Sequence, residues 1–296
     1  MKYSESQILK FTSGKNFGDE NFPVSSFLIS KQKKVPIRIF YKFARIADDI
    51  ADNKELSSKK KIEILNFFDS CLANKTRKKL KFLDDLVEIF IAQNLSLENA
   101  RKLLIAFKLD ATKLRYKTWP ELIDYCSNSA SPVGRFVIEL HLKKICKKQT
   151  LRKIFHGSDK LCNCLQILNH FQDIKDDLQN LNRVYIPKEM FNDEKDLIKS
   201  IKCKKSSTKF EKIKLFYLNK IDILLKESES LLWLIPQKSL KRETFVILCI
   251  AKKLTELLKK NDPLKKKVKL SYIDLIFCYF KGIMKVLKNN KSFKSM

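Results

Sequence analysis

The sequence predicts an all-α protein, and three observations lead to this fold class. The chain of 296 residues contains only 5 glycines and 7 prolines, which leaves few turn-forming residues for a hairpin-rich protein. Leu, Ile, Lys and Phe are abundant, and 44% of the residues are hydrophobic, which is enough for a sizeable core. No internal repeat and no clean domain boundary is visible, so we expect one domain over residues 1–296.

Start signals place the expected helices along the chain. Pro36 is tolerated in a first helical turn and can open a helix over residues 36–52. Ser57-Ser58 and Ser158-Asp159 are N-cap candidates, and the helix after the second pair would continue through residue 177. Further helices are expected at about 96–116, at 119–127, from 131 onwards, and at about 209–233, 239–260 and 269–288.

The chain is strongly basic, with 61 lysines and arginines against 33 acidic residues and a net charge of +28. Only nine of the basic residues are arginines, so an AT-rich coding sequence would explain the lysine excess without any function. Alternatively, the charge attracts a polyanion: nucleic acid, acidic lipid headgroups or a diphosphate substrate. The basic residues form no single compact block, which argues against nucleic acid as a partner.

Eight cysteines are scattered without a CxxC pair, and several lie in apolar helical patterns as small hydrophobic residues. This usage is typical of a reducing cytosol, so we expect a cytoplasmic protein. Residues 1–15 lack the apolar core of a signal peptide, and no apolar run reaches the roughly 18 residues of a membrane span. The aromatic-rich residues 269–288 have two interpretations: a core helix, or a helix lying on the inner surface of a membrane.

Two acidic segments more than a hundred residues apart are the most informative feature. Each repeats polar side chains at a spacing of four within an apolar pattern, so that they fall on one stripe of a helix. Like charges at this spacing weaken an isolated helix by roughly 0.2–0.5 kcal/mol, and a single such stripe is usually a solvated face. The stripes are Tyr41, Arg45, Asp48 and Asp52, with Asp49 beside them, and Asn169, Asp173 and Asp177.

The apolar flanks of both segments predict that these carboxylates are buried. Buried carboxylates require cations or hydrogen bonds, and two such segments suggest a cation held between them. Mg²⁺ is suitable, because it binds a few carboxylates together with substrate phosphates. Three arginines lie near these features: Arg45 in the first segment, Arg135 after the small-residue break at 129–134, and Arg183 after the second segment. The planar guanidinium group of arginine suits the oxygens of a diphosphate. His170, inside the second segment, is expected to be a core histidine.

Together these motifs resemble the squalene/phytoene synthase family over roughly residues 10–190, while residues 200–296 are diverged. The motifs that carry the resemblance are Tyr41-x-x-x-Arg45-x-x-Asp48-Asp49-x-x-Asp52, the segment from Tyr125 to Arg135, and Asn169-x-x-x-Asp173-x-x-x-Asp177 followed by Arg183-Val184-Tyr185-Ile186-Pro187. Within the family the chain looks most like the hopanoid-pathway branch, the hydroxysqualene synthases. That likeness rests on Ser13-Gly14-Lys15, residues 19–24, residues 109–116 and Ser129–Arg135.

The resemblance implies an isoprenoid-synthase bundle of helices around a central apolar pocket, with Mg²⁺ bound at its mouth. The implied metal ligands are Asp48, Asp52, Asp173 and Asp177. The implied catalytic residues are Tyr41, Tyr125 and Asp49. The implied substrate-binding residues are Phe22, Arg45, Arg135, Asn169, Arg183 and Tyr185.

The implied reaction converts presqualene diphosphate to hydroxysqualene and pyrophosphate, with Mg²⁺ and without NADPH. The alternative within the family joins two farnesyl or geranylgeranyl diphosphates into presqualene diphosphate, squalene or phytoene. A different class of function is a basic helical module that binds RNA or acidic membranes, in which the acidic stripes are merely salt-bridging faces. The implied partners are a prenyl diphosphate, the inner membrane surface and other squalene-pathway enzymes, and not nucleic acid. No arginine follows Arg242, so any later basic contact to a diphosphate must come from lysine.

Overall fold

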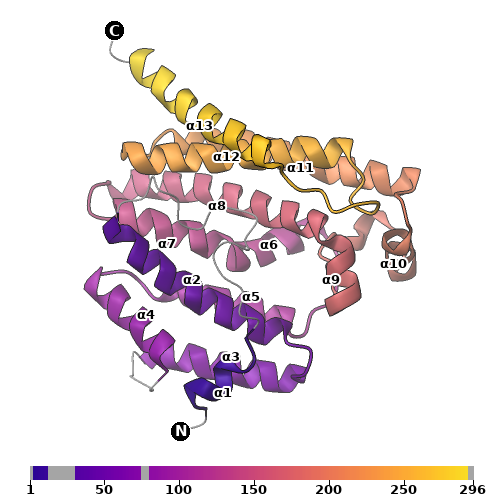
Figure 1. Cartoon of the computed structure of the whole chain (residues 1–296), viewed down its shortest axis with the longest axis horizontal. Coiled ribbons are helices and arrows are strands. Elements are labelled where there is room, and N and C mark those ends of the chain that lie inside the picture. Colours follow the sequence, from indigo (N-terminus) through magenta and orange to yellow (C-terminus); the bar gives the residue numbers. More distant parts are fainter. Residues whose placement is uncertain (1–2, 13–30, 75–79, 293–296) are drawn as a thin grey trace. The chain divides into compact units, whose positions relative to one another are not determined.

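The structure is a computed structural model that describes residues 3–12, 31–74 and 80–292 (Figure 1). Within these ranges the chain forms thirteen α-helices, one short 3₁₀ helix and no β-strand. A single isolated bridge pairs Arg115 with Val184 among these residues. The all-α prediction is confirmed, and the low glycine and proline content explains why most of the chain is helical.

Backbone contacts divide the chain into two compact units. Unit 1 comprises Met1–Lys113 and Ser127–Lys144, and unit 2 comprises Leu114–Cys126 and Ile145–Met296. Helix α6 (Trp119–Ser129) begins in unit 2 and ends in unit 1. The expectation of a single domain over the whole chain stays a prediction.

Unit 1 packs around a phenylalanine-rich core. Phe40 of α2 (Lys31–Asp52) stacks on Phe136 of α7 (Ser131–Leu142), with 4.3 Å between ring centroids. Phe90 of α4 (Lys81–Ala92) stacks on the same ring at 5.2 Å. Such pairs add roughly 0.5–1.5 kcal/mol beyond burial, and here they hold the helix that carries the first acidic segment. The other helices of unit 1 are α1 (Glu5–Leu9), α3 (Ser58–Asn74) and α5 (Glu98–Asp110).

Helix α2 begins at Lys31, upstream of the expected start at Pro36. The residues before the proline are mostly lysine and glutamine, which favour helix, so the helix extends past the proline and encloses it. Pro36 therefore lies inside the helix, where it has no N–H to donate to the carbonyl of Gln32. The helix ends at Asp52, so it carries the whole first acidic segment, as expected.

Helix α5 ends at Asp110 instead of continuing to residue 116. Two backbone hydrogen bonds occupy the residues that would have extended the helix. Val184 N donates to Leu114 O at 3.0 Å, and Lys188 N donates to Tyr116 O at 3.0 Å. This extended pairing brings Tyr116 beside the segment that contains two of the predicted substrate-binding residues.

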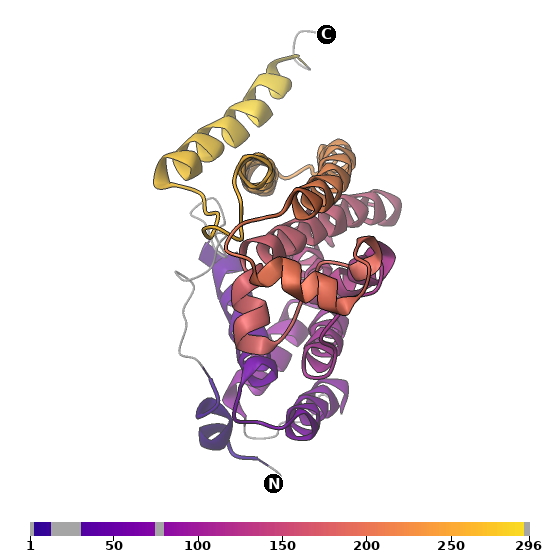
Figure 2. The same ribbon diagram turned by 90° about the vertical axis from the view of Figure 1, so that its right-hand side faces the viewer.

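Unit 2 consists of long helices packed side by side (Figures 1 and 2). Helix α8 (Lys148–Gln172) contacts α11 (Thr208–Leu232) at Gly157, whose carbonyl accepts a hydrogen bond from Ser228 Oγ at 2.7 Å. A Cβ on Gly157 would lie only 2.8 Å from Leu231 Cβ, so this close approach requires glycine. The remaining elements are α9 (Ile174–Leu181), the 3₁₀ helix (Lys188–Met190), α10 (Glu194–Lys202), α12 (Lys238–Lys260) and α13 (Tyr272–Ser292).

Helix α13 crosses the outer side of α12 in both views (Figures 1 and 2). The three C-terminal helices α11, α12 and α13 confirm the patterns expected at about 209–233, 239–260 and 269–288. No helix in the described part of the chain is both long and apolar enough to cross a bilayer.

Candidate functional site

The first acidic segment lies on the C-terminal half of α2 and is organised by one guanidinium. Arg45 Nη2 donates to Asp49 Oδ1 at 2.7 Å, and Arg45 Nη1 lies 3.2 Å from Asp48 Oδ2. Asp49 is buried, whereas 34% of the Asp48 side chain is exposed. Arg45 therefore holds the buried Asp49, while the neighbouring Asp48 side chain is only partly exposed.

The pKa of the Asp48 carboxyl is raised well above its usual value. The largest cause is the loss of water around the carboxyl on packing, and the next is repulsion from Asp52, one helical turn away. Arg45 opposes the rise, while Asp110 and Asp49 add further repulsion. Asp48, Asp49 and Asp52 thus lie within about one helical turn of one another, the first two in contact with a single guanidinium, and carboxylates gathered in this way are suitable ligands for a divalent cation.

The second acidic segment spans the junction of α8 and α9, so the expectation of one continuous helix from residue 158 is wrong. Helix α8 begins at Lys148 and ends at Gln172, and Asp173 has left the helical conformation with φ −102° and ψ 8°. Hydrogen bonds of the helical type nevertheless persist across the junction. Asp173 N donates to Asn169 O at 2.9 Å, and Asp177 N donates to Asp173 O at 2.7 Å. The four-residue stagger of these side chains is therefore retained.

A lysine between α12 and α13 lies against this second segment. Lys267 forms an ion pair with Asp173, and its Nζ lies 3.6 Å from Asp176 Oδ2. Burial alone would lower the pKa of Lys267, but the bond to Asp173 outweighs that effect and the pKa is raised. Gln172 Nε2, at the end of α8, donates to Val268 O at 2.6 Å. This hydrogen bond ties the backbone of the linker that contains Lys267 to α8.

Lys267 was not among the predicted site residues. The sequence offered one signal for it, since the absence of arginine after Arg242 required any late basic contact to be a lysine. That signal could not distinguish Lys267 from the many other lysines of the C-terminal third.

Four rings from three chain segments form an aromatic cluster in unit 2, made of Tyr116, Tyr125, His170 and Tyr185. His170 stacks on Tyr185 with 3.6 Å between centroids, and Tyr125 lies 5.4 Å from Tyr185. Tyr116 lies 5.2 Å from Tyr125 and 5.6 Å from Tyr185. Arg183 is buried, and its Nη1 donates to Tyr185 Oη at 3.5 Å. The predicted residues Tyr125, Arg183 and Tyr185 are thus brought together, and His170 is buried as expected.

The predicted site residues are divided between the two units, and Phe22 lies outside the described residues. Arg135, on α7, has a half-buried side chain. Unit 1 contains Tyr41, Arg45, Asp48, Asp49, Asp52 and Arg135. Unit 2 contains Tyr125, Asn169, Asp173, Asp177, Arg183 and Tyr185.

The chemistry of both acidic segments suits a divalent cation that also binds a substrate. Carboxylate oxygens are hard ligands, and each segment carries carboxylates at a helical spacing of four. Among the described residues, no three His, Cys, Asp or Glu side chains converge in a ready-made metal site. Mg²⁺ is commonly bound by one or two carboxylates together with water and substrate phosphates.

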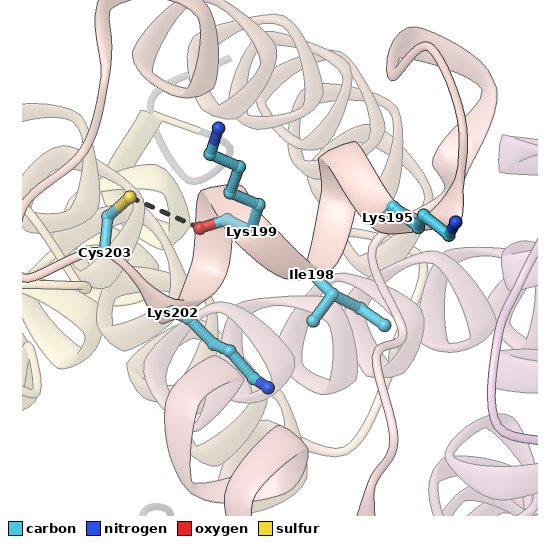
Figure 3. Close-up of a pocket in the computed structure, with 5 residues that line it drawn as sticks. All are labelled: Lys195, Ile198, Lys199, Lys202 and Cys203. Carbon is cyan, nitrogen blue, oxygen red and sulfur yellow. Dashed lines mark hydrogen bonds between the residues drawn. The ribbon is translucent and has the colours of Figure 1, made fainter.

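Figure 3 shows a surface hollow of about 450 Å³ along α10, which offers different chemistry. Three exposed lysines line it together with Ile198 and Cys203, whose Sγ donates to Lys199 O at 3.3 Å. Its lining contains neither a carboxylate nor an aromatic ring, so its side chains provide no oxygen ligand for Mg²⁺ and no aromatic face for a carbocation.

The family model described as squalene/phytoene synthase matches residues 16–274. A hydroxysqualene synthase of Sinorhizobium fredii is 36% identical over 260 residues, covering 87% of this chain and 86% of the relative. A hydroxysqualene synthase of Zymomonas mobilis is 36% identical over 258 residues, covering 86% and 84%. A third, from Rhodopseudomonas palustris, is 34% identical over 268 residues and covers 90% and 89%.

Two solved structures resemble the fold. The squalene synthase HpnC from Alicyclobacillus acidocaldarius has a TM-score of 0.69 at 24% identity, covering 86% of this chain and 93% of that one. A dehydrosqualene synthase solved in complex with a ligand has a TM-score of 0.74 at 20% identity, covering 96% and 95%. Together they show that the described helices adopt the fold of squalene synthase-type enzymes.

Proposed function

Because the chain belongs to the squalene/phytoene synthase family, we propose that it converts presqualene diphosphate and water into hydroxysqualene and pyrophosphate. Three relatives named hydroxysqualene synthase, 34–36% identical over most of their lengths, favour this reaction over the others in the family. Family membership also favours an enzyme over a basic module that only binds RNA or membranes. The structural observation that supports the proposal most is the contact of one guanidinium, that of Arg45, with both Asp48 and Asp49 on α2.

Departure of the diphosphate leaves a cyclopropylcarbinyl cation, so the charge of the leaving group must be neutralised. When bound, Mg²⁺ supplies Lewis-acid stabilisation of the leaving diphosphate. The chain's part is to supply the carboxylates and to fix their orientation before the substrate arrives. We assign as metal ligands Asp48, Asp52, Asp173 and Asp177.

Arg45 positions the first group of ligands. Its guanidinium contacts both Asp48 and Asp49, so these carboxylates are oriented before any ligand binds. Pre-orientation of this kind lowers the entropy loss of reaching the reactive geometry. Since Asp49 is buried, we assign it the role of holding Arg45 rather than that of a direct ligand.

Lys267 positions the second group of metal ligands, which contains Asp173 and Asp177. Its ammonium forms an ion pair with the Asp173 carboxylate. When Asp173 serves as a metal ligand, the ammonium of Lys267 becomes available to the diphosphate oxygens. Lys267 then supplies a basic contact from the part of the chain after Arg242, which contains no arginine, alongside Asn169 and Arg183.

The aromatic cluster supplies the surface that a carbocation requires. Aromatic faces attract cations, by about 2 kcal/mol or more where water is excluded. Tyr125 and Tyr185 therefore border the reacting carbon in our proposal, and Arg183 fixes the Tyr185 hydroxyl. One water captures the cation, and its surplus proton leaves to solvent, so the reaction needs no hydride from NADPH. Tyr41, Phe22 and Arg135 keep their predicted roles at the substrate within this proposal.

Product analysis by mass spectrometry tests the proposed reaction. The protein is incubated with presqualene diphosphate and Mg²⁺, with and without NADPH, and separately with farnesyl diphosphate alone. We expect hydroxysqualene and pyrophosphate from presqualene diphosphate in both nucleotide conditions, and no turnover of farnesyl diphosphate. Accumulation of presqualene diphosphate or squalene from farnesyl diphosphate would overturn the proposal in favour of the condensing reaction.

The cellular setting follows from the substrate and from the cysteines. All eight cysteines are free thiols, which supports a reducing, cytoplasmic location. Presqualene diphosphate has a long apolar tail and the product lacks a charged headgroup, so we propose that the enzyme works peripherally at the inner face of the membrane. We also propose that it associates there with the enzymes that make its substrate or consume its product.

A further inference from the structure

The last helix exposes a continuous apolar face. Seven large apolar residues of α13 are between 36% and 78% exposed. At about 100° per residue they fall within an arc of about 140° on one side of the helix. The outer face of α13, as we call it, consists of Tyr272, Ile273, Ile276, Phe277, Phe280, Met284 and Leu287.

The opposite side of α13 is packed closely on α12, so the helix cannot rotate to bury its outer face. A Cβ on Gly282 would lie 2.6 Å from both Cα and N of Val246, so the two helix backbones nearly touch there. Cys278 and Val286, one turn to either side, are buried. Lys253 Nζ lies 3.1 Å from Asp274 Oδ1, which ties the first turn of α13 to α12. The apolar outer face is therefore held outward.

Lysines border the outer face. Lys281 and Lys288 lie next to it on the helix surface, and Lys281 Nζ sits 5.6 Å from the centroid of the Phe277 ring. Residues 261–296 contain nine lysines against two aspartates. Both aspartates already have partners, Asp274 with Lys253 and Asp262 with Ser206. Lys267 and Lys285 pair with Asp173 and Glu229, and the exposed Lys281 and Lys288 remain as the basic border of the apolar surface.

We propose that the outer face of α13 docks the enzyme on an anionic lipid bilayer, with the helix lying in the plane of the interface. Phenylalanine and isoleucine side chains would enter the boundary between headgroups and acyl chains, while lysines contact anionic headgroups. A convex helix with a basic border matches a negatively charged, deformable surface, and this charge complementarity favours lipid over a protein partner. The inference rests on the proposed function only for the claim that the enzyme works at a membrane.

Vesicle sedimentation of the full chain tests the docking surface. One set of vesicles contains phosphatidylcholine with about 30% phosphatidylglycerol, and the other contains phosphatidylcholine alone. The double variant Phe277→Glu/Phe280→Glu changes residues that are 59% and 62% exposed. The matched control Ile91→Glu/Ile145→Glu changes residues that are 60% and 61% exposed and lie on other elements.

We expect the wild-type chain and the control to sediment with anionic vesicles, more weakly at high salt, and the α13 variant to bind at least tenfold more weakly. Absence of wild-type binding to anionic vesicles, or equal binding by the α13 variant, would overturn the proposal. A concentration-dependent dimer that the α13 variant dissociates, without vesicle binding, would assign the face to a second copy of the chain and also overturn it.

A separate readout distinguishes this proposal from the proposed reaction. Turnover of presqualene diphosphate dispersed in detergent should be the same for the wild-type chain, the α13 variant and the control. If vesicle binding follows the expected pattern but no chain releases pyrophosphate, the reaction fails and the docking surface stands. If all three chains turn over substrate but none binds vesicles, the docking surface fails and the reaction stands.

Discussion

The imidazole ring of His170 lies parallel to the phenol ring of Tyr185, with centroids 3.6 Å apart and an angle of 11° between the planes. The Nδ1 atom of the same imidazole lies 3.9 Å from Asp177 Oδ2. His170 therefore links the second acidic segment to the segment that carries Arg183 and Tyr185. A histidine that looks like ordinary core in the sequence thus helps to position two groups of predicted site residues.

Replacing His170 by alanine removes this stacking contact and leaves a cavity beside Tyr185. We expect His170→Ala to lower the free energy of unfolding by about 2–4 kcal/mol, because a buried ring is lost. His170→Phe keeps a ring for Tyr185 and is expected to lose less than about 1.5 kcal/mol. Urea unfolding followed by circular dichroism measures both. Equal stability of the two variants would mean that the stack contributes nothing.

Gly282 permits the close approach of α13 to α12. In Gly282→Ala the new Cβ meets backbone atoms of Val246, which cannot move independently, so the helices must separate. We expect a loss of about 1–3 kcal/mol in the free energy of unfolding. Met284→Ala, at an exposed position of the same helix, is the control and should change stability by less than about 0.5 kcal/mol. A Gly282→Ala chain as stable as the control would refute the tight contact.

Glu229 on α11 joins three helices, because its carboxylate pairs with Lys252 of α12 and Lys285 of α13. Burial alone would raise the pKa of Glu229, but the hydrogen bonds from the two lysines outweigh it and the pKa is lowered. A lowered folded-state pKa gives stability that is present above the ordinary value of 4.5 and is lost as pH falls through the folded pKa.

We therefore expect Glu229→Gln to lower the free energy of unfolding by about 1 kcal/mol at pH 7. The difference between this variant and the wild-type chain should shrink as pH falls below about 4.5. Urea titrations at pH 7 and at several acidic pH values measure it. A stability difference that stays constant down to pH 3 would contradict the role of this ionised carboxylate.

Lys267 offers a test with opposite effects on two ligands. In Lys267→Gln the Asp173 carboxylate loses its ion-pair partner, so Mn²⁺, used as a probe for Mg²⁺, should bind more tightly. Inorganic pyrophosphate with Mg²⁺ should bind about 10-fold more weakly, because a cation that would contact its oxygens is gone. Isothermal titration calorimetry measures both affinities. Lys269→Gln is the control, and a Lys267→Gln chain that matches it for both ligands would remove Lys267 from the site.

Sequence patterns predicted the parts of the fold that depend on local composition. The α2 stripe of Arg45, Asp48 and Asp52 follows from helical spacing and apolar flanks alone, and α2 carries the whole stripe. The three C-terminal helices were similarly recognisable. Local periodicity specifies such helices because each buries a continuous apolar side.

The break at Asp173 and the role of Lys267 were not predictable in this way. The chain around Asp173 retains helical hydrogen bonds on both sides, so its local pattern remains that of one helix. What distinguishes the junction is its contacts with a segment about 90 residues further along: Lys267 on Asp173, and Val268 on Gln172. Contacts between residues so distant in sequence leave no periodic trace. The pairing that ends α5 early, between Leu114 and Val184, has the same origin.

The rate of pyrophosphate release from presqualene diphosphate by carboxylate variants tests the central claim most directly. The chains compared are the wild type, Asp48→Asn, Asp173→Asn, and Asp222→Asn as a control that removes an exposed carboxylate paired with Lys259. We expect Asp48→Asn and Asp173→Asn each to lower kcat/KM at least about 100-fold at saturating Mg²⁺, with circular dichroism spectra unchanged and the control near wild type. Turnover within about twofold of wild type in both Asp48→Asn and Asp173→Asn would contradict the assignment of the two acidic segments as the metal–diphosphate site.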